Sequence, residues 1–251
     1  MLIMYAVITG ASSGIGKELA YRLSEKGYDL VLVARRLDRL NKIKKDLASK
    51  GNDIKLFNLD LHNLDNCSKL MEGISSLNVE LFINNAGYGQ VGETSSIETS
   101  NELAMIDLNI KTLHFLTKKY LEIFSTGIIV NISSMAAFLP TPLMASYAAT
   151  KAYVYSFSQA INYELKKAKK DIRVLTVAPG PVKTEFAEVA NANPKMKGIT
   201  VEKCVKAIIK GIEKKKKLII PGTTLKITRL LLRFLPLKLV LHFSYKIQNR
   251  K

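Results

Sequence analysis

The chain has 251 residues, of which 47% are hydrophobic, and a formal net charge of +17. This length and apolar content are ordinary for one α/β domain with a sizeable core, and two cysteines, Cys67 and Cys204, exclude a disulfide framework. Most of the excess charge lies in residues 214–251, which hold eight lysines, three arginines and no acid. The body is therefore not uniformly basic, and nucleic acid is not a predicted partner.

The first predicted unit is a strand, a glycine-rich loop and a helix. The apolar run 2–8 follows no charged segment or cleavage site, so no signal peptide is predicted. It leads into Thr9-Gly10-Ala11-Ser12-Ser13-Gly14-Ile15-Gly16, and a helical pattern then continues to Gly27. Glycines permit a tight turn and a close approach to a pyrophosphate at the positive helix N-terminus. The spacing Gly-x-x-x-Gly-x-Gly differs from the commoner Gly-x-Gly-x-x-Gly, yet its context predicts a dinucleotide site rather than a flexible loop.

The end of the second predicted strand, residues 29–34, discriminates between cofactors. A site for NAD requires an acid about 20 residues past the glycine loop, where it binds the ribose 2′-hydroxyl. Arg35 and Arg36 stand here instead, and no acid follows until Asp38. A guanidinium matches a phosphate in bidentate geometry, so the pair predicts NADP(H) in preference to NAD(H). The alternative is a solvated arginine pair at a helix start.

The remaining elements alternate in the same way. Further strands are predicted at 54–58, 79–83, 127–132, 173–177 and 218–220, and helices at 37–51, 64–77, 98–124, 147–165 and 200–211. Seven strands alternating with helices indicate a Rossmann-type, doubly wound parallel sheet with helices on both faces. No repeat or linker divides residues 1–222, which form one predicted domain, and residues 185–198 have no periodicity and are predicted to form a mobile loop.

Polar residues follow several of these predicted strands. Asp60 is interpreted either as an acceptor for the adenine amino group or as a helix cap. The segment Asn84-Asn85-Ala86-Gly87 is typical of a sharp strand-end turn. Asn109 lies inside a predicted helix, where it is either exposed or bonded inward, and His114 is expected to be packed or exposed rather than catalytic.

Tyr147 and Lys151 begin a predicted helix at spacing i, i+4, which puts the phenol and the ammonium on one helix face. A free phenol has a pKa of about 10. A positive charge nearby lowers that pKa and makes the tyrosine a usable general acid or base. Alone this spacing is a weak signal, because an aromatic ring beside an aliphatic stem is common. The flanking motifs supply the context.

These motifs occur together in one known order. The chain resembles the short-chain dehydrogenase/reductase family in its compact, NADP-preferring form, over about residues 1–222. The matching segments are Thr9 to Gly16, Asp60, Asn84 to Gly87, Asn109, Ser134 thirteen residues before Tyr147, Lys151, and Pro179-Gly180 through Thr184.

The resemblance implies hydride transfer between a nicotinamide and a carbonyl or alcohol carbon. Tyr147 would donate a proton to the developing alkoxide, Lys151 would lower the Tyr147 pKa and hold the nicotinamide ribose, and Ser134 would hydrogen-bond the substrate oxygen. Asn109 would support a water-linked proton path through Lys151. The residues implied in cofactor binding, with the arginine pair, are Gly10, Ser12, Ser13, Gly14, Ile15, Gly16, Arg35, Arg36, Asp60, Leu61, Asn85, Ala86, Gly87, Tyr147, Lys151, Pro179, Gly180, Val182 and Thr184.

The predicted function is that of an NADP(H)-dependent oxidoreductase acting on an apolar ketone, aldehyde or 3-oxoacyl compound. The apolar residues expected around the carbonyl, which are equally consistent with core packing, are Met135, Ala136, Phe138, Leu139, Leu143, Met144 and Phe186. The resemblance also implies a homodimer or homotetramer, with the helices around Asn109 and Tyr147 at the interface. No metal is predicted, because the His and Cys residues lack ligand spacing. The alternative is a non-catalytic NADP(H)-binding sensor or scaffold at a membrane surface.

The C-terminal extension, residues 223–251, is basic, leucine-rich and amphipathic. Its first part predicts a helix, Pro236 interrupts the pattern, and charges and proline together argue against a spanning helix of about 20 apolar residues. The cations on one face, at i, i+3 and i+7, are Lys226, Arg229 and Arg233. Two interpretations remain open. The helix packs on its own or a partner subunit with its cations solvated, or it gives a cytoplasmic protein a peripheral contact with the inner face of a membrane.

Overall fold

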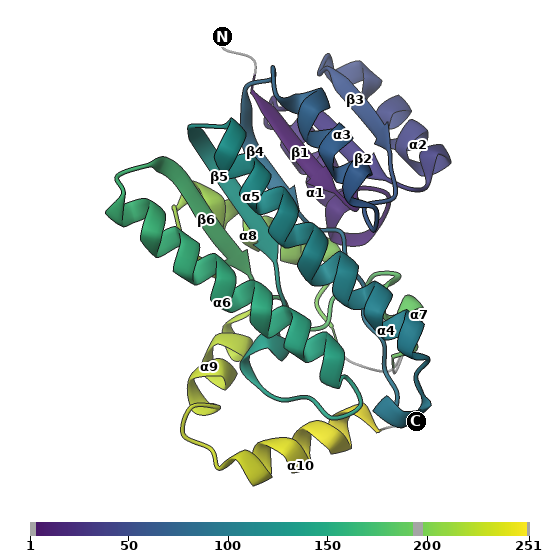
Figure 1. The fold of residues 1–251 in the computed structure, drawn as a ribbon, viewed down its shortest axis with the longest axis vertical. Coiled ribbons are helices and arrows are strands. Elements are labelled where there is room, and N and C mark those ends of the chain that lie inside the picture. The colour runs from purple at the N-terminus through teal and green to yellow at the C-terminus, as the bar shows by residue number, and fades with distance from the viewer. Residues whose placement is uncertain (1–3, 193–197, 250–251) are drawn as a thin grey trace.

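The structure, a computed structural model, describes residues 4–192 and 198–249, which form a seven-stranded parallel sheet (Figure 1). The strands are β1 Tyr5–Thr9, β2 Asp29–Ala34, β3 Ile54–Asn58, β4 Val79–Asn84, β5 Thr126–Ile132, β6 Asp171–Val177 and β7 Leu218–Ile219. They lie in the order β3-β2-β1-β4-β5-β6-β7, and every pairing is parallel. The predicted Rossmann-type sheet is therefore confirmed.

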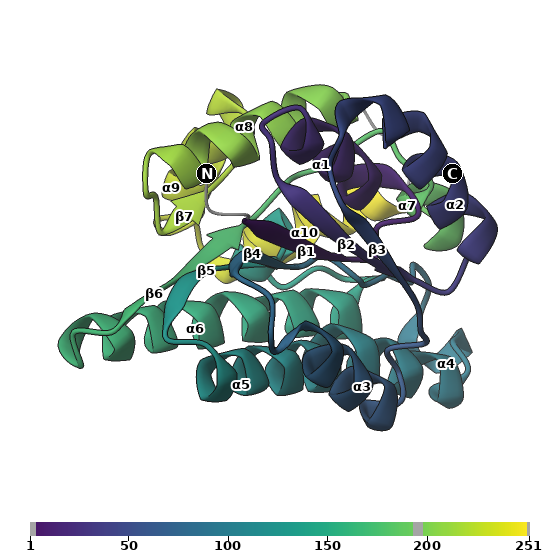
Figure 2. The ribbon, with the colours of Figure 1, turned by 90° about the horizontal axis from the view of Figure 1, so that it is seen from above.

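Helices cover both faces of this sheet (Figure 2). One face is covered by α1 Gly14–Ser24, α2 Leu37–Leu47 and α8 Val201–Glu213. The other face is covered by α3 Leu64–Ile74, α5 Leu113–Ile123 and α6 Ala145–Lys167. The predicted cap of α8 is present, because the Thr200 side chain accepts a hydrogen bond from the Lys203 amide.

The strands are buried on both sides, which explains their nearly continuous apolar sequences. Successive residues of a strand point to opposite faces, so Ile8 packs toward α1 and α2 while Val7 packs toward α3. Both cysteine thiols, Cys67 and Cys204, are free and buried in these two layers.

The strand order reverses between β1 and β4, and this point joins two of the predicted motifs. The Thr9 hydroxyl accepts hydrogen bonds from the amides of Asn85 (2.9 Å) and Ala86 (3.0 Å). In return, Asn85 Nδ2 donates to the Thr9 carbonyl at 2.9 Å. The glycine loop after β1 and the Asn turn after β4 are thereby fixed to each other at the carboxyl edge of the sheet, where doubly wound folds bind ligands.

Two segments depart from the expected pattern. The predicted helix 98–124 is α4 Thr99–Ile106 and α5, joined by a π-helical segment, Asp107–Thr112, that contains Asn109. The predicted loop 185–198 contains a short helix, α7 Phe186–Val189. The part of that prediction that falls on residues 193–197 lies outside the described residues, as do residues 1–3 and 250–251.

The C-terminal extension forms two helices, α9 Thr223–Leu231 and α10 Leu237–Gln248, which lie at one end of the molecule (Figure 1). Leu225 packs into an apolar cluster with Met135, Ala178 and Ile220. Arg229 lies over the Phe138 ring, 4.6 Å from its centroid, so the expectation that all the cations of this helix are solvated is wrong for Arg229. Within the described ranges, no helix combines the length and the hydropathy that crossing a bilayer requires.

Candidate active site

A cleft of about 2090 Å³ opens at the carboxyl edge of the sheet. It extends from the glycine loop after β1, past Tyr147, to the C-terminal helices α9 and α10. Every residue predicted to bind cofactor lines this cleft except Gly16, and so do Ser134, Tyr147 and Lys151 of the predicted catalytic set. Gly16 and Asn109 lie behind the cleft wall.

The glycine loop is shaped to receive an anion. Ser13 is the N-cap residue of α1, yet its side chain does not cap the helix and so leaves the first amides of α1 to an anion. Gly10 and Gly14 have φ values of +65° and +52°, a left-handed conformation that favours glycine. A Cβ on Gly16 would lie 2.4 Å from the Gly10 carbonyl oxygen, so Gly16 allows the helix to pack against the loop. These features fit the pyrophosphate of a dinucleotide.

Arg36 is bound at the rim of this loop rather than free in solvent. Its Nη2 donates to the Ser12 hydroxyl at 3.0 Å and to the Ser13 hydroxyl at 2.9 Å, and its Nη1 donates to Glu185 Oε2 at 3.0 Å. Arg39 pairs with the other oxygen of Glu185. Hydrogen bonds from Arg36 and Arg39 hold the pKa of Glu185 below its usual range. The sequence analysis did not predict a role for Glu185.

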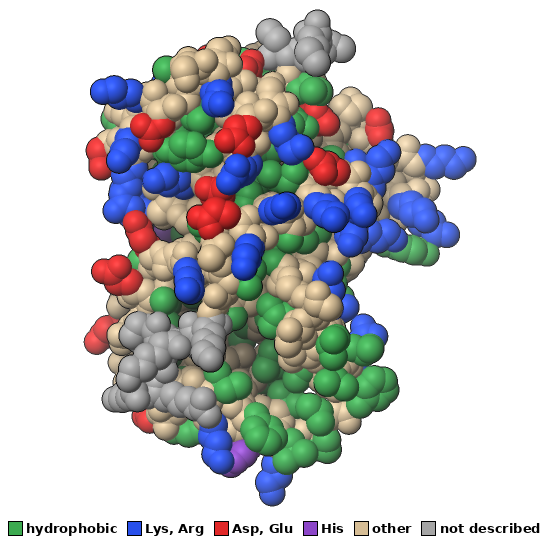
Figure 3. Space-filling model, turned by 180° about the vertical axis from the view of Figure 1, so that it is seen from behind, with side chains coloured by type: hydrophobic (Ala, Val, Ile, Leu, Met, Phe, Trp, Pro, Cys, Tyr) green, Lys and Arg blue, Asp and Glu red, His purple; other side chains and the backbone are tan. Residues whose placement is uncertain are grey.

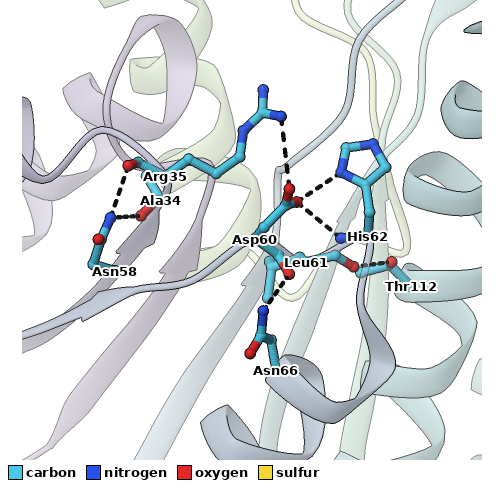
Figure 4. Close-up of polar contacts among 8 residues, drawn as sticks. All are labelled: Ala34, Arg35, Asn58, Asp60, Leu61, His62, Asn66 and Thr112. Carbon is cyan, nitrogen blue, oxygen red and sulfur yellow. Dashed lines mark hydrogen bonds and ion pairs between the residues drawn. The ribbon is translucent and has the colours of Figure 1, made fainter.

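Asp60 lies opposite Arg35 at the edge of the cleft (Figure 4). Its Oδ1 accepts from the His62 amide at 3.1 Å and lies 2.7 Å from His62 Nδ1, while Oδ2 lies 4.0 Å from Arg35 Nη1. Burial acts to raise the Asp60 pKa, but the His62 hydrogen bonds and the Arg35 charge outweigh it, so the pKa is lowered. The N-cap of α3 is Asn63, whose side chain accepts from the Asp65 amide, so the helix-cap interpretation of Asp60 is wrong.

Backbone groups around Asp60 are held by neighbouring side chains (Figure 4). Asn58 Nδ2 donates to the Arg35 carbonyl at 2.7 Å, and Asn66 Nδ2 donates to the Asp60 carbonyl at 3.0 Å. The Thr112 hydroxyl donates to the Leu61 carbonyl at 2.5 Å. The segment that lines this end of the cleft is therefore fixed by α3 and by the π-helical segment.

Tyr147 and Lys151 are buried together in the middle of the cleft wall, with exposed fractions of 7% and 5%. Lys151 Nζ lies 5.7 Å from the Tyr147 ring centroid and donates to the Ile132 carbonyl at 3.0 Å. The Ser134 side chain lines the cleft beside Tyr147 and acts to lower the pKa of its phenol. The Ser133 hydroxyl, which the sequence analysis did not select, donates to the Lys151 carbonyl at 2.7 Å and ties α6 to the end of β5.

Burial controls the protonation of this pair. It raises the pKa of Tyr147 to about 12, against an opposing effect of the Ser134 side chain, and it lowers the pKa of Lys151 to about 8. The expectation that Lys151 lowers the Tyr147 pKa is therefore not met in this geometry. The physical reason is that burial removes hydration from each charged form, and neither side chain offsets this loss for the other.

Asn109 turns inward, which resolves the alternative left open by the sequence. It is 1% exposed, and its side chain pairs with the Tyr88 backbone by accepting from the amide at 3.2 Å and donating to the carbonyl at 2.9 Å. A Cβ on Gly87 would lie 2.7 Å from Asn109 Oδ1 and 3.4 Å from Lys151 Nζ. Only a glycine at this position leaves space between Asn109 and Lys151.

The far end of the cleft is apolar. Of the residues expected around a carbonyl, Met135, Ala136, Leu139, Met144 and Phe186 line the cleft. Phe138 and Leu143 do not line the cleft. The Phe138 ring packs edge-on against Tyr155 instead. His114 is packed, as expected, with Nδ1 2.7 Å from the Tyr153 hydroxyl. The C-terminal extension also lines the cleft, which its local sequence does not predict, and its apolar residues in the lining are Leu225, Leu232, Leu235, Val240, Phe243 and Ile247.

A parallel sheet of this topology, with Ser134 and the buried Tyr147 and Lys151 in one cleft with an anion-receiving glycine loop, defines an oxidoreductase that acts on CH–OH or C=O groups. Comparison with known proteins is more specific. The family model described as short chain dehydrogenase matches residues 4–195, and the chain belongs to that family.

Similar proteins cover most of the chain. The very-long-chain 3-oxoacyl-CoA reductase of Mus musculus is 30% identical over 257 residues, which cover 98% of this chain and 81% of the mouse protein. A short-chain dehydrogenase from Sphingobium yanoikuyae, solved in complex with NADPH, is 30% identical with a TM-score of 0.82 over 93% of this chain and 96% of the other. The bulky-bulky ketone specific alcohol dehydrogenase from Comamonas testosteroni is 29% identical with a TM-score of 0.79 over 93% and 95%.

Proposed function

We propose that this protein is an NADP(H)-dependent reductase of an apolar ketone, aldehyde or 3-oxoacyl compound. The observation that carries the proposal is the position of the Tyr147 phenol, which is buried and lies beside Lys151 in a cleft that Ser134, the glycine loop and Arg36 also line. The NADPH complex of the Sphingobium protein and the names of the mouse and Comamonas proteins support the cofactor and the substrate class.

The residues that would hold the dinucleotide fall into three groups. The amides at the start of α1 would receive the pyrophosphate. Arg36, with Arg35 nearby, would bind the 2′-phosphate, and Asp60, which lines the same cleft, would accept a hydrogen bond from the adenine amino group. The segment from Pro179 to Thr184 would form the third group, and it borders the glycine loop, since Thr184 is the nearest contact of a Cβ built on Gly14. When bound, the nicotinamide would supply the hydride for the carbonyl carbon.

The chain's own residues would then manage the charge and the proton on the substrate oxygen. Because burial holds the Tyr147 pKa at about 12, the phenol is neutral at physiological pH and is able to donate a proton to that oxygen. Ser134 would hydrogen-bond the same oxygen and stabilise its growing charge. Lys151, with its pKa near 8, gains and loses a proton close to neutral pH, so it is suited to relay protons to Tyr147. Asn109 would support that path from behind Gly87.

Substitution of the phenol tests this assignment. Tyr147→Phe should keep NADPH affinity within about threefold while kcat/KM for ketone reduction falls by roughly two to four orders of magnitude. The matched control is Tyr163→Phe, an exposed tyrosine on the same helix, which should leave turnover unchanged. A Tyr147→Phe protein with full activity across a panel of apolar ketones would overturn the proposed chemistry.

The cofactor preference is tested separately by fluorescence titration with NADPH and NADH. The wild-type protein should bind NADPH more tightly, and Arg36→Ala should remove most of the difference, because the guanidinium pairs only with the 2′-phosphate. Equal affinities in the wild type, or an unchanged ratio in Arg36→Ala, would contradict the assignment.

We also propose a homodimer or homotetramer, with α5 and α6 at the interface. Both helices expose apolar side chains, Ile123 and Tyr163. Light scattering after size-exclusion chromatography should give a mass of two or four chains, whereas a monomer at micromolar concentration would contradict the proposal.

A further inference from the structure

Helix α9 carries an apolar stripe on the side that faces away from the cleft. Ile227, Leu230 and Leu231 recur at i, i+3 and i+4, so they share one face of α9, and Phe234 follows in the turn that ends the helix. The exposed fractions of these four residues, the stripe, run from 55% to 79%. None of the four lines the cleft. A surface helix normally turns polar side chains to solvent. A contiguous exposed apolar patch marks a site of contact with a protein or with a membrane.

The opposite side of α9 is held by the body of the protein. Leu225 packs into the apolar cluster below the 3-10 turn Met135–Phe138. The Arg229 guanidinium stacks on Phe138 and donates to the Tyr155 hydroxyl at 3.1 Å. These contacts fix the rotation of α9 about its axis. The stripe is therefore presented to solvent by the fold and is not the side of a detached tail.

Helix α10 has the same two-sided character. Val240 and Ser244, one turn apart, are buried, and both line the cleft together with Phe243 and Ile247. Other apolar side chains of α10 are exposed without lining the cleft, namely Leu237, Leu239 and Tyr245. Figure 3 shows hydrophobic side chains gathered over this end of the molecule, next to the hollow of the cleft. Apolar surface thus lies on both the inner and the outer side of these helices.

Cations flank the apolar patch, and no acid balances them. Residues 214–249 contain no Asp or Glu, and the exposed cations of α9, α10 and the turn between them are Lys226, Arg233, Lys238 and Lys246. A second copy of the chain would oppose this patch with the same cations, and like charges across an interface are repulsive. An anionic surface would instead attract each of these lysines and arginines.

We propose that α9 and α10 dock this protein on the surface of an anionic lipid bilayer. The apolar stripe of α9 enters the boundary between headgroups and acyl chains, and the flanking cations contact the headgroups. The helices have 9 and 12 residues, which is too short to span the hydrocarbon core. Because their inner sides line the cleft, docking holds the cleft beside the bilayer, so an apolar substrate reaches it from the lipid. That last point rests on the proposed function, whereas the docking itself does not.

Vesicle co-sedimentation of the full chain tests the docking. The protein should bind vesicles of phosphatidylcholine and phosphatidylserine, bind phosphatidylcholine alone much more weakly, and lose affinity as salt is raised. The double variant Leu230→Asp with Phe234→Asp should lower the partition coefficient by at least about a hundredfold, since two apolar side chains no longer enter the bilayer. The matched control is Leu103→Asp on α4, because Leu103 is 56% exposed and Leu230 is 57% exposed. Replacing Arg233 and Lys238 by Ser should cost about fivefold for each cation.

NADPH affinity and the light-scattering mass of each variant show that it is folded and report its assembly. Vesicle binding by the double variant at the wild-type level would overturn the proposal, as would a wild-type protein that ignores anionic vesicles. A double variant that changes the mass of the assembly, with vesicle binding unchanged, would make the stripe a subunit interface and would also overturn it. None of these readouts uses turnover, so failure of the docking is distinguishable from failure of the proposed reductase activity.

Discussion

Glu185 forms an ion pair with Arg36 at 3.0 Å, across 149 positions of sequence. The same guanidinium donates to the hydroxyls of Ser12 and Ser13 in the glycine loop. Arg39 binds the second oxygen of Glu185, so one carboxylate joins the segment before α7 to two arginines beside the loop. If Arg36 receives the 2′-phosphate, Glu185 competes with that phosphate for the same donor.

Glu185→Gln should therefore strengthen binding of NADPH relative to NADH. The substitution removes a negative charge that repels the phosphate and releases the guanidinium, and at this partly exposed site we expect an effect of about fivefold to tenfold on the ratio of dissociation constants. Fluorescence titration with both dinucleotides measures it. Glu188→Gln is the control, because among the described residues Glu188 pairs with neither arginine. An unchanged ratio would mean that the two anions do not share Arg36.

Asn109→Ala should destabilise the fold by roughly 2–4 kcal/mol. The side chain satisfies both the amide and the carbonyl of Tyr88, and an unpaired buried group costs about 1–3 kcal/mol. Urea unfolding followed by circular dichroism gives the free energy of unfolding. Asn101→Ala, an exposed position on α4, should change it by no more than about 0.5 kcal/mol. Equal stability of the two variants would show that the Tyr88 backbone groups find other partners.

The affinity for NADPH should fall as the pH rises through 8. Lys151 is cationic below its pKa of about 8 and neutral above it, and the cationic form attracts the polyanionic dinucleotide more strongly. Binding of NADPH therefore takes up a proton near this pH. Where the uptake reaches one full proton, the affinity falls by up to about tenfold for each unit by which the pH rises. NADPH titrations at pH values on both sides of this pKa should show a steeper fall in affinity for the wild type than for Lys151→Met. The control Lys167→Met, which alters an exposed lysine on the same helix, should behave like the wild type. Identical slopes in all three proteins would assign the pH dependence to another group.

Leu235→Asp should impair the reduction of long-chain ketones more than that of short ones. Leu235 lines the apolar end of the cleft, and loss of its contact with a buried acyl chain is worth about 1.5–3 kcal/mol, or roughly tenfold or more in KM. Steady-state kinetics with 2-dodecanone and 2-butanone compare the two, with Leu103→Asp as a control that lies outside the cleft. A parallel change in both KM values would show that the C-terminal helices do not contact the substrate.

The motifs of this protein were readable from local sequence because a parallel sheet brings the carboxyl ends of its strands to one edge. Each motif follows a strand directly, as the glycine loop follows β1 and Asn85 follows β4, so alternation of strands and helices alone predicts that they meet. The helical spacing of Tyr147 and Lys151 likewise puts both side chains on one face wherever the helix lies. These predictions depend only on the alternation of strands and helices and on the number of residues per helical turn.

Tertiary structure decided what depends on burial and on contacts between distant segments. The high pKa of Tyr147 follows from burial, which local spacing does not report. The ion pair between Glu185 and Arg36 and the packing of α9 on Phe138 join residues far apart in sequence. The sequence of the basic extension allows two interpretations, packing on a subunit or binding to a membrane, because its amphipathic pattern suits either. The structure shows the inner sides of α9 and α10 against the cleft and leaves an apolar face outward, since packing one side of a helix against the body fixes which residues the other side presents.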